Sequence, residues 1–158
     1  MKNRDLKSLE SSAREWINHI HGILPDGKRD WVGIYWLESF LIPGSSSTDL
    51  VVGPYVGPPT PHTRIQIGSG LCGLSVKENR TVNVSDVRAE PRFLACSTQT
   101  RSEIVIPIRL KNGDIVGELD IDSNDIGSFT AEDQKRLEDE VKKFGTSLSD
   151  ELPAYSRD

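Results

Sequence analysis

A four-residue turn at 111–114 lies between two apolar runs and constrains the fold of the chain strongly. Its Asn-Gly dipeptide is a strong signal for a β-hairpin when apolar runs flank it. Residues 103–110 and 115–121 are therefore predicted to pair as antiparallel strands. Further runs rich in β-branched and aromatic residues predict strands at 31–37, 50–55, 64–67 and 81–84.

Amphipathic helices are predicted at both ends of the chain. In residues 3–24, apolar side chains recur at spacings of three and four, the pattern of a helix with one buried face. Thr130 and Asp133 form a variant of the capping box and open a second helix. The apolar stripe of this helix is Leu137, Val141, Phe144 and Leu148.

The chain of 158 residues has the length of one domain. No repeat or change of composition divides it, so residues 1–158 are predicted to form a single domain with a frayed tail at 150–158. A short helix is predicted at 71–77. Strand hairpins between terminal helices predict an α+β fold, a six-stranded antiparallel sheet with the N- and C-terminal helices packed on one face.

Charge and hydropathy exclude several classes of protein. With 19 Lys and Arg against 24 Asp and Glu, the net charge is −5, which argues against a nucleic-acid partner. No apolar run approaches the roughly 18–20 residues of a membrane span. The first ten residues lack the apolar core of a signal peptide, so a cytoplasmic protein without a membrane partner is expected.

Cys72 and Cys96 are the two cysteines of the chain, and a domain of this size needs no disulfide for stability. Each stands alone and the three histidines are scattered, so neither a metal site nor a cofactor is predicted. Cys72 lies near the start of the predicted short helix, whose dipole favours a thiolate. Cys96 lies in an irregular segment that precedes Arg101 and Glu103. Core packing and reactivity are both open for each sulfur.

Acidic residues alternate with apolar ones near the end of the hairpin. Glu118, Asp120 and Asp122 share one face of the predicted strand because strand side chains alternate. A solvated face is one interpretation. However, aspartate is depleted in strands and like charges repel, so a cationic partner such as a ligand ammonium group is the alternative.

Aromatic residues form a second pattern on the strand at 31–37. Trp31, Gly33 and Tyr35 share one face, and Gly33 leaves a dent that could receive a small apolar group. Packing in the core is the other interpretation. His62 is expected to lie exposed in a loop rich in proline.

These motifs together resemble those of the free methionine-(R)-sulfoxide reductases, which are single-domain GAF proteins. The resemblance covers a core of about residues 28–149 and implies the GAF fold. The matching motifs are Asp30-Trp31-Val32-Gly33-Ile34-Tyr35, Gly53-Pro54-Tyr55, Gly70-Leu71-Cys72-Gly73, Ala95-Cys96, Ser102-Glu103-Ile104-Val105 and Leu119-Asp120-Ile121-Asp122-Ser123.

The resemblance implies reduction of the free R-sulfoxide of methionine. Cys96 matches the cysteine that attacks the sulfoxide sulfur, and Cys72 matches a second cysteine able to form a disulfide with it. Glu103 matches a carboxyl group near the sulfoxide. The implied cycle passes through a sulfenic acid and a disulfide, which thioredoxin or another thiol reduces.

The binding residues follow from the same resemblance. Asp120 and Asp122 match the acids that hold the substrate, and Trp31 and Tyr35 match the aromatic wall at its methyl end. One position departs from the family, because His62 stands where a third cysteine usually serves in recycling. A non-catalytic GAF module that binds an amino-acid-like ligand or senses redox state is therefore the alternative function. A homodimer through the terminal helices is a further possibility that GAF domains imply.

Overall fold

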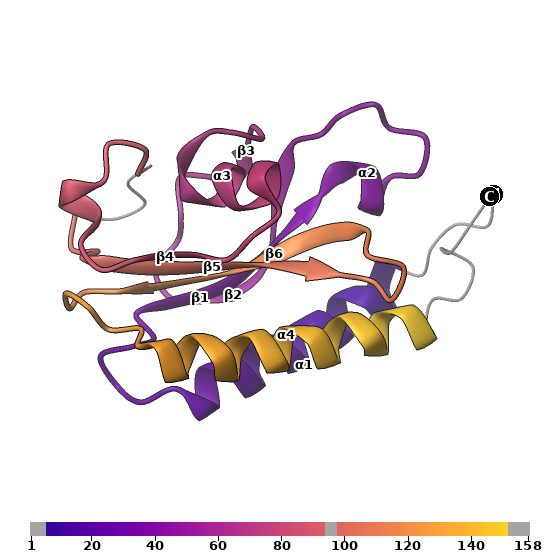
Figure 1. Cartoon of the computed structure of the whole chain (residues 1–158). Helices are drawn as coiled ribbons and strands as arrows, with labels where there is room; N and C mark the ends of the chain where they lie inside the picture. The colour runs from indigo at the N-terminus through magenta and orange to yellow at the C-terminus, as the bar shows by residue number, and fades with distance from the viewer. Residues whose placement is uncertain (1–5, 94–97, 152–158) are drawn as a thin grey trace.

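The computed structural model describes residues 6–93 and 98–151 (Figure 1). Cys96 and the Ala-Cys motif lie outside these residues. The elements in chain order are α1 (Leu6–Ile23), β1 (Trp31–Leu37), α2 (Glu38–Leu41), β2 (Leu50–Val56), β3 (Arg64–Ile65), α3 (Gly70–Glu78), β4 (Val82–Val84), a 3₁₀ turn (Val87–Ala89), β5 (Ser102–Arg109), β6 (Ile115–Ser123) and α4 (Ala131–Glu151).

The described strands form one six-stranded sheet in the order β3-β2-β1-β6-β5-β4. Every neighbouring pair is antiparallel. The hairpin predicted around the Asn-Gly turn is the β5–β6 pair. The fold is therefore the predicted α+β arrangement.

Helices α1 and α4 lie side by side on one face of the sheet (Figure 1). The rings of Trp16 in α1 and Phe144 in α4 stack with centroids 4.2 Å apart. The predicted stripe of α4 is buried against the sheet, so the amphipathic pattern identified the packed face correctly. The predicted cap is also present, because Asp133 N–H donates to Thr130 Oγ1 over 3.1 Å and Thr130 N–H donates to Asp133 Oδ2 over 3.0 Å.

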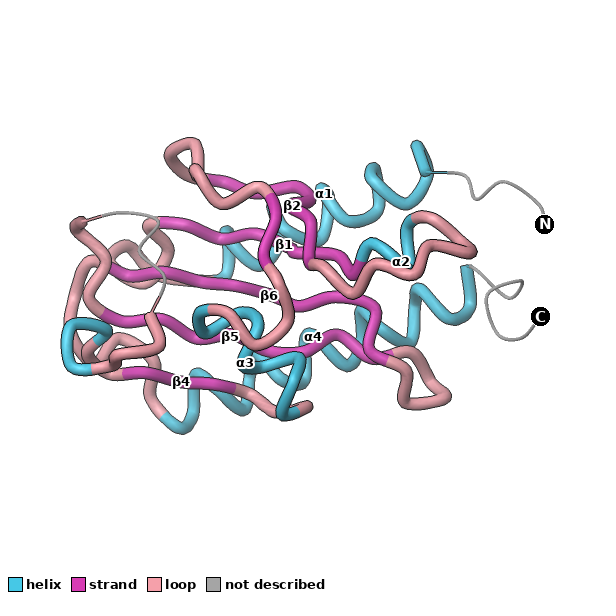
Figure 2. Tube along the Cα trace, turned by 90° about the horizontal axis from the view of Figure 1, so that it is seen from above, coloured by secondary structure: helices cyan, strands magenta, loops and turns pink. Residues whose placement is uncertain are grey.

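The opposite face of the sheet is covered by α3, which lies over β5 and β6 (Figure 2). The sheet thus has two buried faces and two apolar clusters. One cluster joins the sheet to α1 and α4, and the other joins Trp31 and Tyr35 of β1 to the apolar residues of α3. Polar side chains placed on the α3 face are consequently removed from water.

Two local expectations differ from the structure, and one short helix was not expected. Helix α2 was not predicted, because four residues are too few to show a helical period. The strand expected at 64–67 ends at Ile65, since a turn closed by Ser69 N–H on the Gln66 carbonyl follows it. The first two residues of the expected frayed tail, Asp150 and Glu151, belong to α4, while 152–158 lie outside the described residues.

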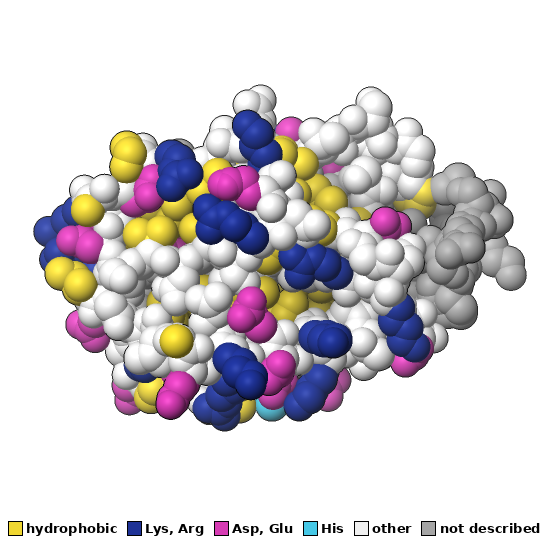
Figure 3. All heavy atoms as spheres, viewed as in Figure 1, with side chains coloured by type: hydrophobic (Ala, Val, Ile, Leu, Met, Phe, Trp, Pro, Cys, Tyr) yellow, Lys and Arg dark blue, Asp and Glu magenta, His cyan; other side chains and the backbone are white. Residues whose placement is uncertain are grey.

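The surface of the molecule mixes charges of both signs. On the face shown in Figure 3, Lys and Arg side chains are scattered among Asp and Glu and do not gather into one basic patch. Within the described ranges, no helix has the length and apolar character needed to cross a membrane.

Candidate active site

The register of the three central strands brings the predicted acids together. Asp122 of β6 pairs with Trp31 on one side and with Glu103 on the other. Two residues along β6, Asp120 pairs with Gly33 and Val105. Because side chains alternate along a strand, Glu103, Asp120 and Asp122 all face α3.

Four carboxyl groups are buried on this face of the sheet. The exposed fractions are 4% for Glu103, 0% for Glu118, 1% for Asp120 and 3% for Asp122. A solvated acidic face, one of the two interpretations of the alternating pattern, is therefore wrong. Burial of four carboxyls without a cation is costly, which favours a cationic ligand.

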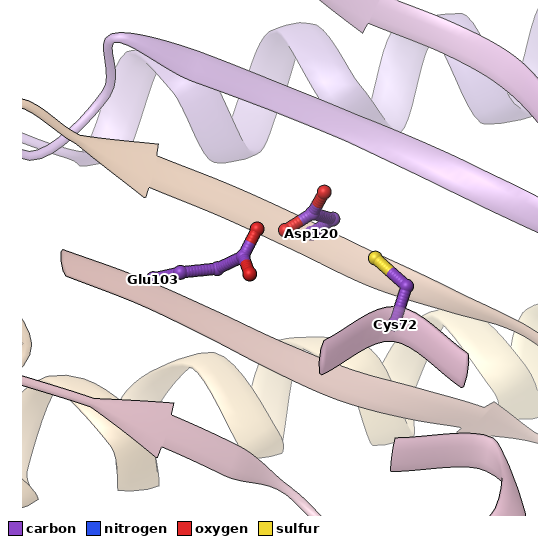
Figure 4. A group of neighbouring side chains, drawn as sticks. All are labelled: Cys72, Glu103 and Asp120. Carbon is purple, nitrogen blue, oxygen red and sulfur yellow. The ribbon is translucent and has the colours of Figure 1, made fainter. Parts of the chain in front are cut away.

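Cys72 reaches the same cluster from α3. Its Sγ, one oxygen of Glu103 and one oxygen of Asp120 all lie within 4.8 Å of one another. Figure 4 shows the three side chains converging from α3, β5 and β6. Helix α3 is held tightly here, because a Cβ on Gly73 would lie 2.6 Å from the Gln66 carbonyl oxygen and 2.7 Å from Gly68 N.

Burial controls the protonation of the acids. Loss of solvation raises the pKa of Glu103 well above its ordinary value, and the neighbouring charges of Asp120 and Asp122 raise it further. Burial likewise raises the pKa of Asp120, Glu118 and Asp122. The site therefore favours neutral carboxylic acids, which can donate a proton.

The Cys72 thiol differs from the expectation based on the helix dipole. Burial raises the pKa of Cys72 well above its ordinary value, and the charges of Asp120, Glu118 and Glu103 act in the same direction. The dipole at the start of α3 is outweighed, because desolvation of a thiolate costs more than one helix terminus returns. Cys72 is thus held as a thiol in this arrangement.

Several carboxyl oxygens of the cluster have no hydrogen-bond partner among the described residues. They are Glu118 Oε1, Glu118 Oε2, Asp120 Oδ1 and Asp122 Oδ1. Buried polar atoms in native proteins nearly always have partners, so unpaired ones point to a bound molecule or ion. The oxygens of Asp120 and Asp122 are available for an ammonium group.

Aromatic rings border the acids, as the sequence indicated. Trp31 stacks on Tyr55 with centroids 5.1 Å apart and on Tyr35 with centroids 6.0 Å apart. The dent predicted at Gly33 is filled within the protein itself, because a Cβ there would lie 2.5 Å from the Trp31 ring and 2.7 Å from Tyr55 Cβ. Tyr55 was not predicted as a site residue, although it lies in the Gly53-Pro54-Tyr55 motif. Its antiparallel partner in the sheet is Gly33.

His62 is half-buried rather than exposed. Its backbone carbonyl accepts a hydrogen bond of 2.7 Å from the Tyr35 hydroxyl. The loop around His62 therefore fixes one ring of the aromatic wall. The Trp31 ring is fixed in a similar way, since its Nε1–H donates to the Pro58 carbonyl over 3.2 Å.

A pocket of about 110 Å³ adjoins the acids at the end of β6. Trp31 and Asp122 form part of its wall, together with Thr100 and Pro58 from two loops. Six of the seven predicted site residues are thus brought to one face of the sheet. The seventh, Cys96, lies outside the described residues, so its position stays a prediction.

The GAF domain family model matches residues 21–142 of this chain. With the six-stranded sheet and its terminal helices, this match shows that the chain belongs to the GAF family. Within that family, the chain belongs with the free methionine-R-sulfoxide reductases, as the motifs predicted. The enzyme of that name from Escherichia coli is 35% identical over 152 residues, which cover 93% of this chain and 86% of the relative.

Other relatives match over a shorter region. GAF domain-containing protein A of Dictyostelium discoideum is 39% identical over 68% of this chain, and the free methionine-R-sulfoxide reductase of Saccharomyces cerevisiae is 34% identical over 73% of it. The chain spans 62% and 64% of the lengths of these two relatives.

Solved structures of free methionine-R-sulfoxide reductases are also similar to this chain. The type II free methionine-R-sulfoxide reductase from Thermoplasma acidophilum has a TM-score of 0.79 and 35% identity, with coverage of 92% of this chain and 96% of that one. The Neisseria meningitidis reductase in complex with its substrate has a TM-score of 0.71 and 32% identity, with coverage of 89% and 81%.

Proposed function

We propose that this protein reduces free L-methionine-(R)-S-oxide to methionine. The observation that carries the proposal is the buried group of Cys72, Glu103 and Asp120 beside an aromatic wall. The similarity to the Escherichia coli reductase over 93% of the chain supports it.

The bare carboxyl oxygens of Asp120 and Asp122 bind the ammonium group of the substrate in this proposal. An ammonium group beside them lowers the cost of their burial, because opposite charges attract strongly where water is excluded. The methyl end of the substrate lies against Trp31 and Tyr35. A methionine inside a peptide chain has no free ammonium group and is therefore rejected.

Cys96 attacks the sulfoxide sulfur as a thiolate while Glu103 gives its proton to the sulfoxide oxygen. The S–O bond breaks and the hydroxyl group passes to Cys96 Sγ while the new bond between the two sulfurs breaks, so methionine leaves and Cys96 carries the oxygen as a sulfenic acid. The Cys72 thiol then displaces this oxygen as water and forms a disulfide with Cys96. An external dithiol such as thioredoxin reduces the disulfide and restores both thiols. The dithiol is itself oxidised to a disulfide.

The direct test is consumption of purified R-epimer with dithiothreitol or thioredoxin, followed as methionine formed. We expect Cys96→Ser to abolish turnover, and Glu103→Gln to slow it by about 10²–10⁴-fold, the contribution typical of a general acid. The S-epimer and N-acetylmethionine sulfoxide serve as control substrates. A wild-type protein that leaves the R-epimer unchanged contradicts the proposal.

Mass spectrometry tests the recycling step separately. We expect a Cys72–Cys96 disulfide to form on addition of the sulfoxide without reductant, and Cys72→Ser to stop after one turnover with Cys96 oxidised. A disulfide that forms equally without substrate would instead indicate a redox sensor.

A non-catalytic GAF module is the second candidate function. It is favoured by His62, which stands where the family usually has a recycling cysteine, and by 32% identity to a structure described as a putative GAF sensor protein from Burkholderia vietnamiensis. Thermal stabilisation by free methionine or its sulfoxide without turnover would support this module.

The thiol-dependent cycle is suited to a reducing compartment, so the cytoplasm is the proposed location. A homodimer through α1 and α4 is a further proposal from the family. Sedimentation of the purified chain tests it.

A further inference from the structure

The cluster below α3 has the donor atoms of a metal site as well as those of a substrate site. Cys72 supplies a sulfur ligand, and Glu103 and Asp120 supply carboxylate oxygens. These three atoms lie within 4.8 Å of one another and come from three different elements (Figure 4). Sequence spacing did not indicate this set, because its members are not paired along the chain.

The distances are close to those that a tetrahedral ion requires. With a zinc–sulfur bond of about 2.3 Å and a zinc–oxygen bond of about 2.0 Å, the ligand atoms of one ion lie about 3.3–3.5 Å apart. The three donors therefore need to move together by about 1 Å, which side-chain rotation can provide.

Independent of the distances, the cluster contains buried oxygens that lack a partner. Asp120 Oδ1 and both oxygens of Glu118 have no hydrogen-bond partner among the described residues, and the two side chains are 1% and 0% exposed. The Cys72 Sγ lies within 4.8 Å of a carboxyl oxygen of Asp120. Unpaired acceptors around a thiol are positions that a cation would occupy.

We propose that Cys72, Glu103 and Asp120 bind a soft divalent cation of the Zn²⁺ class. The sulfur selects a soft ion over Mg²⁺ or Ca²⁺, which prefer oxygen ligands alone. Binding is ligand exchange: the S–H bond of Cys72 and the O–H bonds of Glu103 and Asp120 break, bonds from these atoms to the metal form, the protons pass to solvent, and no electron is transferred. The two buried oxygens of Glu118, which have no hydrogen-bond partner among the described residues, are further acceptors on the same face of the sheet.

A cation in this site excludes the sulfoxide substrate. Asp120 binds either the ion or the ammonium group, and a metal-bound Cys72 cannot condense with a sulfenic acid. Reversible inhibition by Zn²⁺ is the functional consequence, and this consequence alone rests on the proposed reductase activity.

The binding test uses the inactive Cys96→Ser variant, in which Cys72 is the remaining thiol. Titration with Cd²⁺ should produce the ultraviolet sulfur-to-metal charge-transfer band, and Zn²⁺ should remove it by competition. Glu103→Gln in the same background should weaken binding at least about tenfold, in line with losses seen around metal sites. Glu132→Gln, an exposed carboxylate at the start of α4, is the matched control and should have no effect.

Absence of the band in folded Cys96→Ser protein would overturn the proposal. So would a band whose affinity is the same in Glu103→Gln, because the ion would then bind the sulfur without the cluster. Circular dichroism confirms the fold of each variant before titration.

Inhibition is measured afterwards on the wild-type enzyme. Turnover with a chelator present first establishes whether the proposed reductase activity exists, independently of any metal. Zn²⁺ should then raise the apparent KM for the sulfoxide and leave kcat unchanged in initial-rate measurements. An unchanged KM at Zn²⁺ concentrations that saturate the Cys96→Ser variant would overturn the competition.

Discussion

At the scale of one residue, Glu118 shows how much folding stability the protein loses by burying the site. Its carboxyl is fully buried and neither oxygen has a hydrogen-bond partner among the described residues. An unsatisfied buried polar group costs roughly 1–3 kcal/mol. A side chain of this kind is retained for function more readily than for stability.

Replacement of Glu118 by Leu should therefore stabilise the protein by about 1–3 kcal/mol near neutral pH, since an apolar group of similar size removes the unsatisfied acid. Urea unfolding at constant pH measures the change. Glu132→Leu on the exposed surface is the control and should stay within about 0.5 kcal/mol of the wild type. A loss of stability in Glu118→Leu would show that the carboxyl has a partner in the folded protein.

The same acids predict how stability depends on pH. Burial raises the pKa of Glu103, Glu118, Asp120 and Asp122 in the folded protein, whereas unfolded carboxyls ionise near pH 4. Above about pH 4 the unfolded chain loses these protons first, so their contribution to the free energy of unfolding falls as pH rises through the raised pKa values. The advantage of Glu118→Leu should accordingly be larger at pH 8 than at pH 5, and an advantage independent of pH would contradict this origin.

Some of these residue contacts could be predicted from the sequence and others could not. Strand alternation correctly placed the acids of β6 on one face of their strand and the aromatic residues of β1 on one face of theirs, whereas the register that brings the two sets together was not predicted. The position of Cys72 above Asp120 depends on how α3 crosses the sheet, which no local pattern encodes. The burial that raises the pKa of Cys72 was missed for the same reason.

At the scale of elements, α4 is fixed at both its start and its middle. Thr130 and Asp133 cap its N-terminus, and Gly145 packs on the end of β5, where a Cβ would lie 2.0 Å from the Arg109 carbonyl oxygen. The cap was predicted from the sequence. The close approach at Gly145 was not, since a glycine within a helical pattern does not indicate which strand it meets.

Thr130→Ala should destabilise the protein by about 1 kcal/mol, because the N–H of Asp133 loses its capping oxygen. Thermal unfolding at pH 7 measures the loss. Thr130→Ser keeps the hydroxyl and is the matched control. Equal stability of the Ala and Ser variants would contradict a stabilising role of the cap.

Gly145→Ala should destabilise by about 1–3 kcal/mol, since the added methyl group meets backbone that cannot rotate away. Gly22→Ala is the matched control in α1: its Cβ would meet nothing within 4 Å, and alanine favours a helix by up to about 1 kcal/mol. We expect urea unfolding to show a loss of stability for Gly145→Ala and a gain for Gly22→Ala. Stabilisation by both substitutions would show that α4 is not pressed against β5.

At the scale of the whole molecule, the described site residues all lie on the α3 face of the sheet, with the second apolar cluster. Two strands from opposite ends of the sequence, β1 and β6, supply the wall and the acids. The sequence predicted the six strands, the terminal helices and the face that these helices share, but it did not predict the order of the strands in the sheet.

Free methionine sulfoxide should raise the melting temperature of the Cys96→Ser protein, because its ammonium group pairs with the buried acids. At a concentration 100 times the Kd, the gain is about 2.7 kcal/mol, or about 5–10 °C for a domain of this size. N-acetylmethionine sulfoxide lacks the ammonium group and should leave the melting temperature unchanged. Equal stabilisation by both compounds would contradict recognition of the ammonium group.

The pairing of β1 with β6 also determines when the site can form during synthesis of the chain. Trp31 and Asp122 are partners although about 90 residues separate them, and contacts of such long range form late in folding. A nascent chain that has reached only β5 holds Trp31 without the strand that completes its neighbourhood. The acids of β6 and the aromatic wall of β1 therefore come together only after β6 has been synthesised.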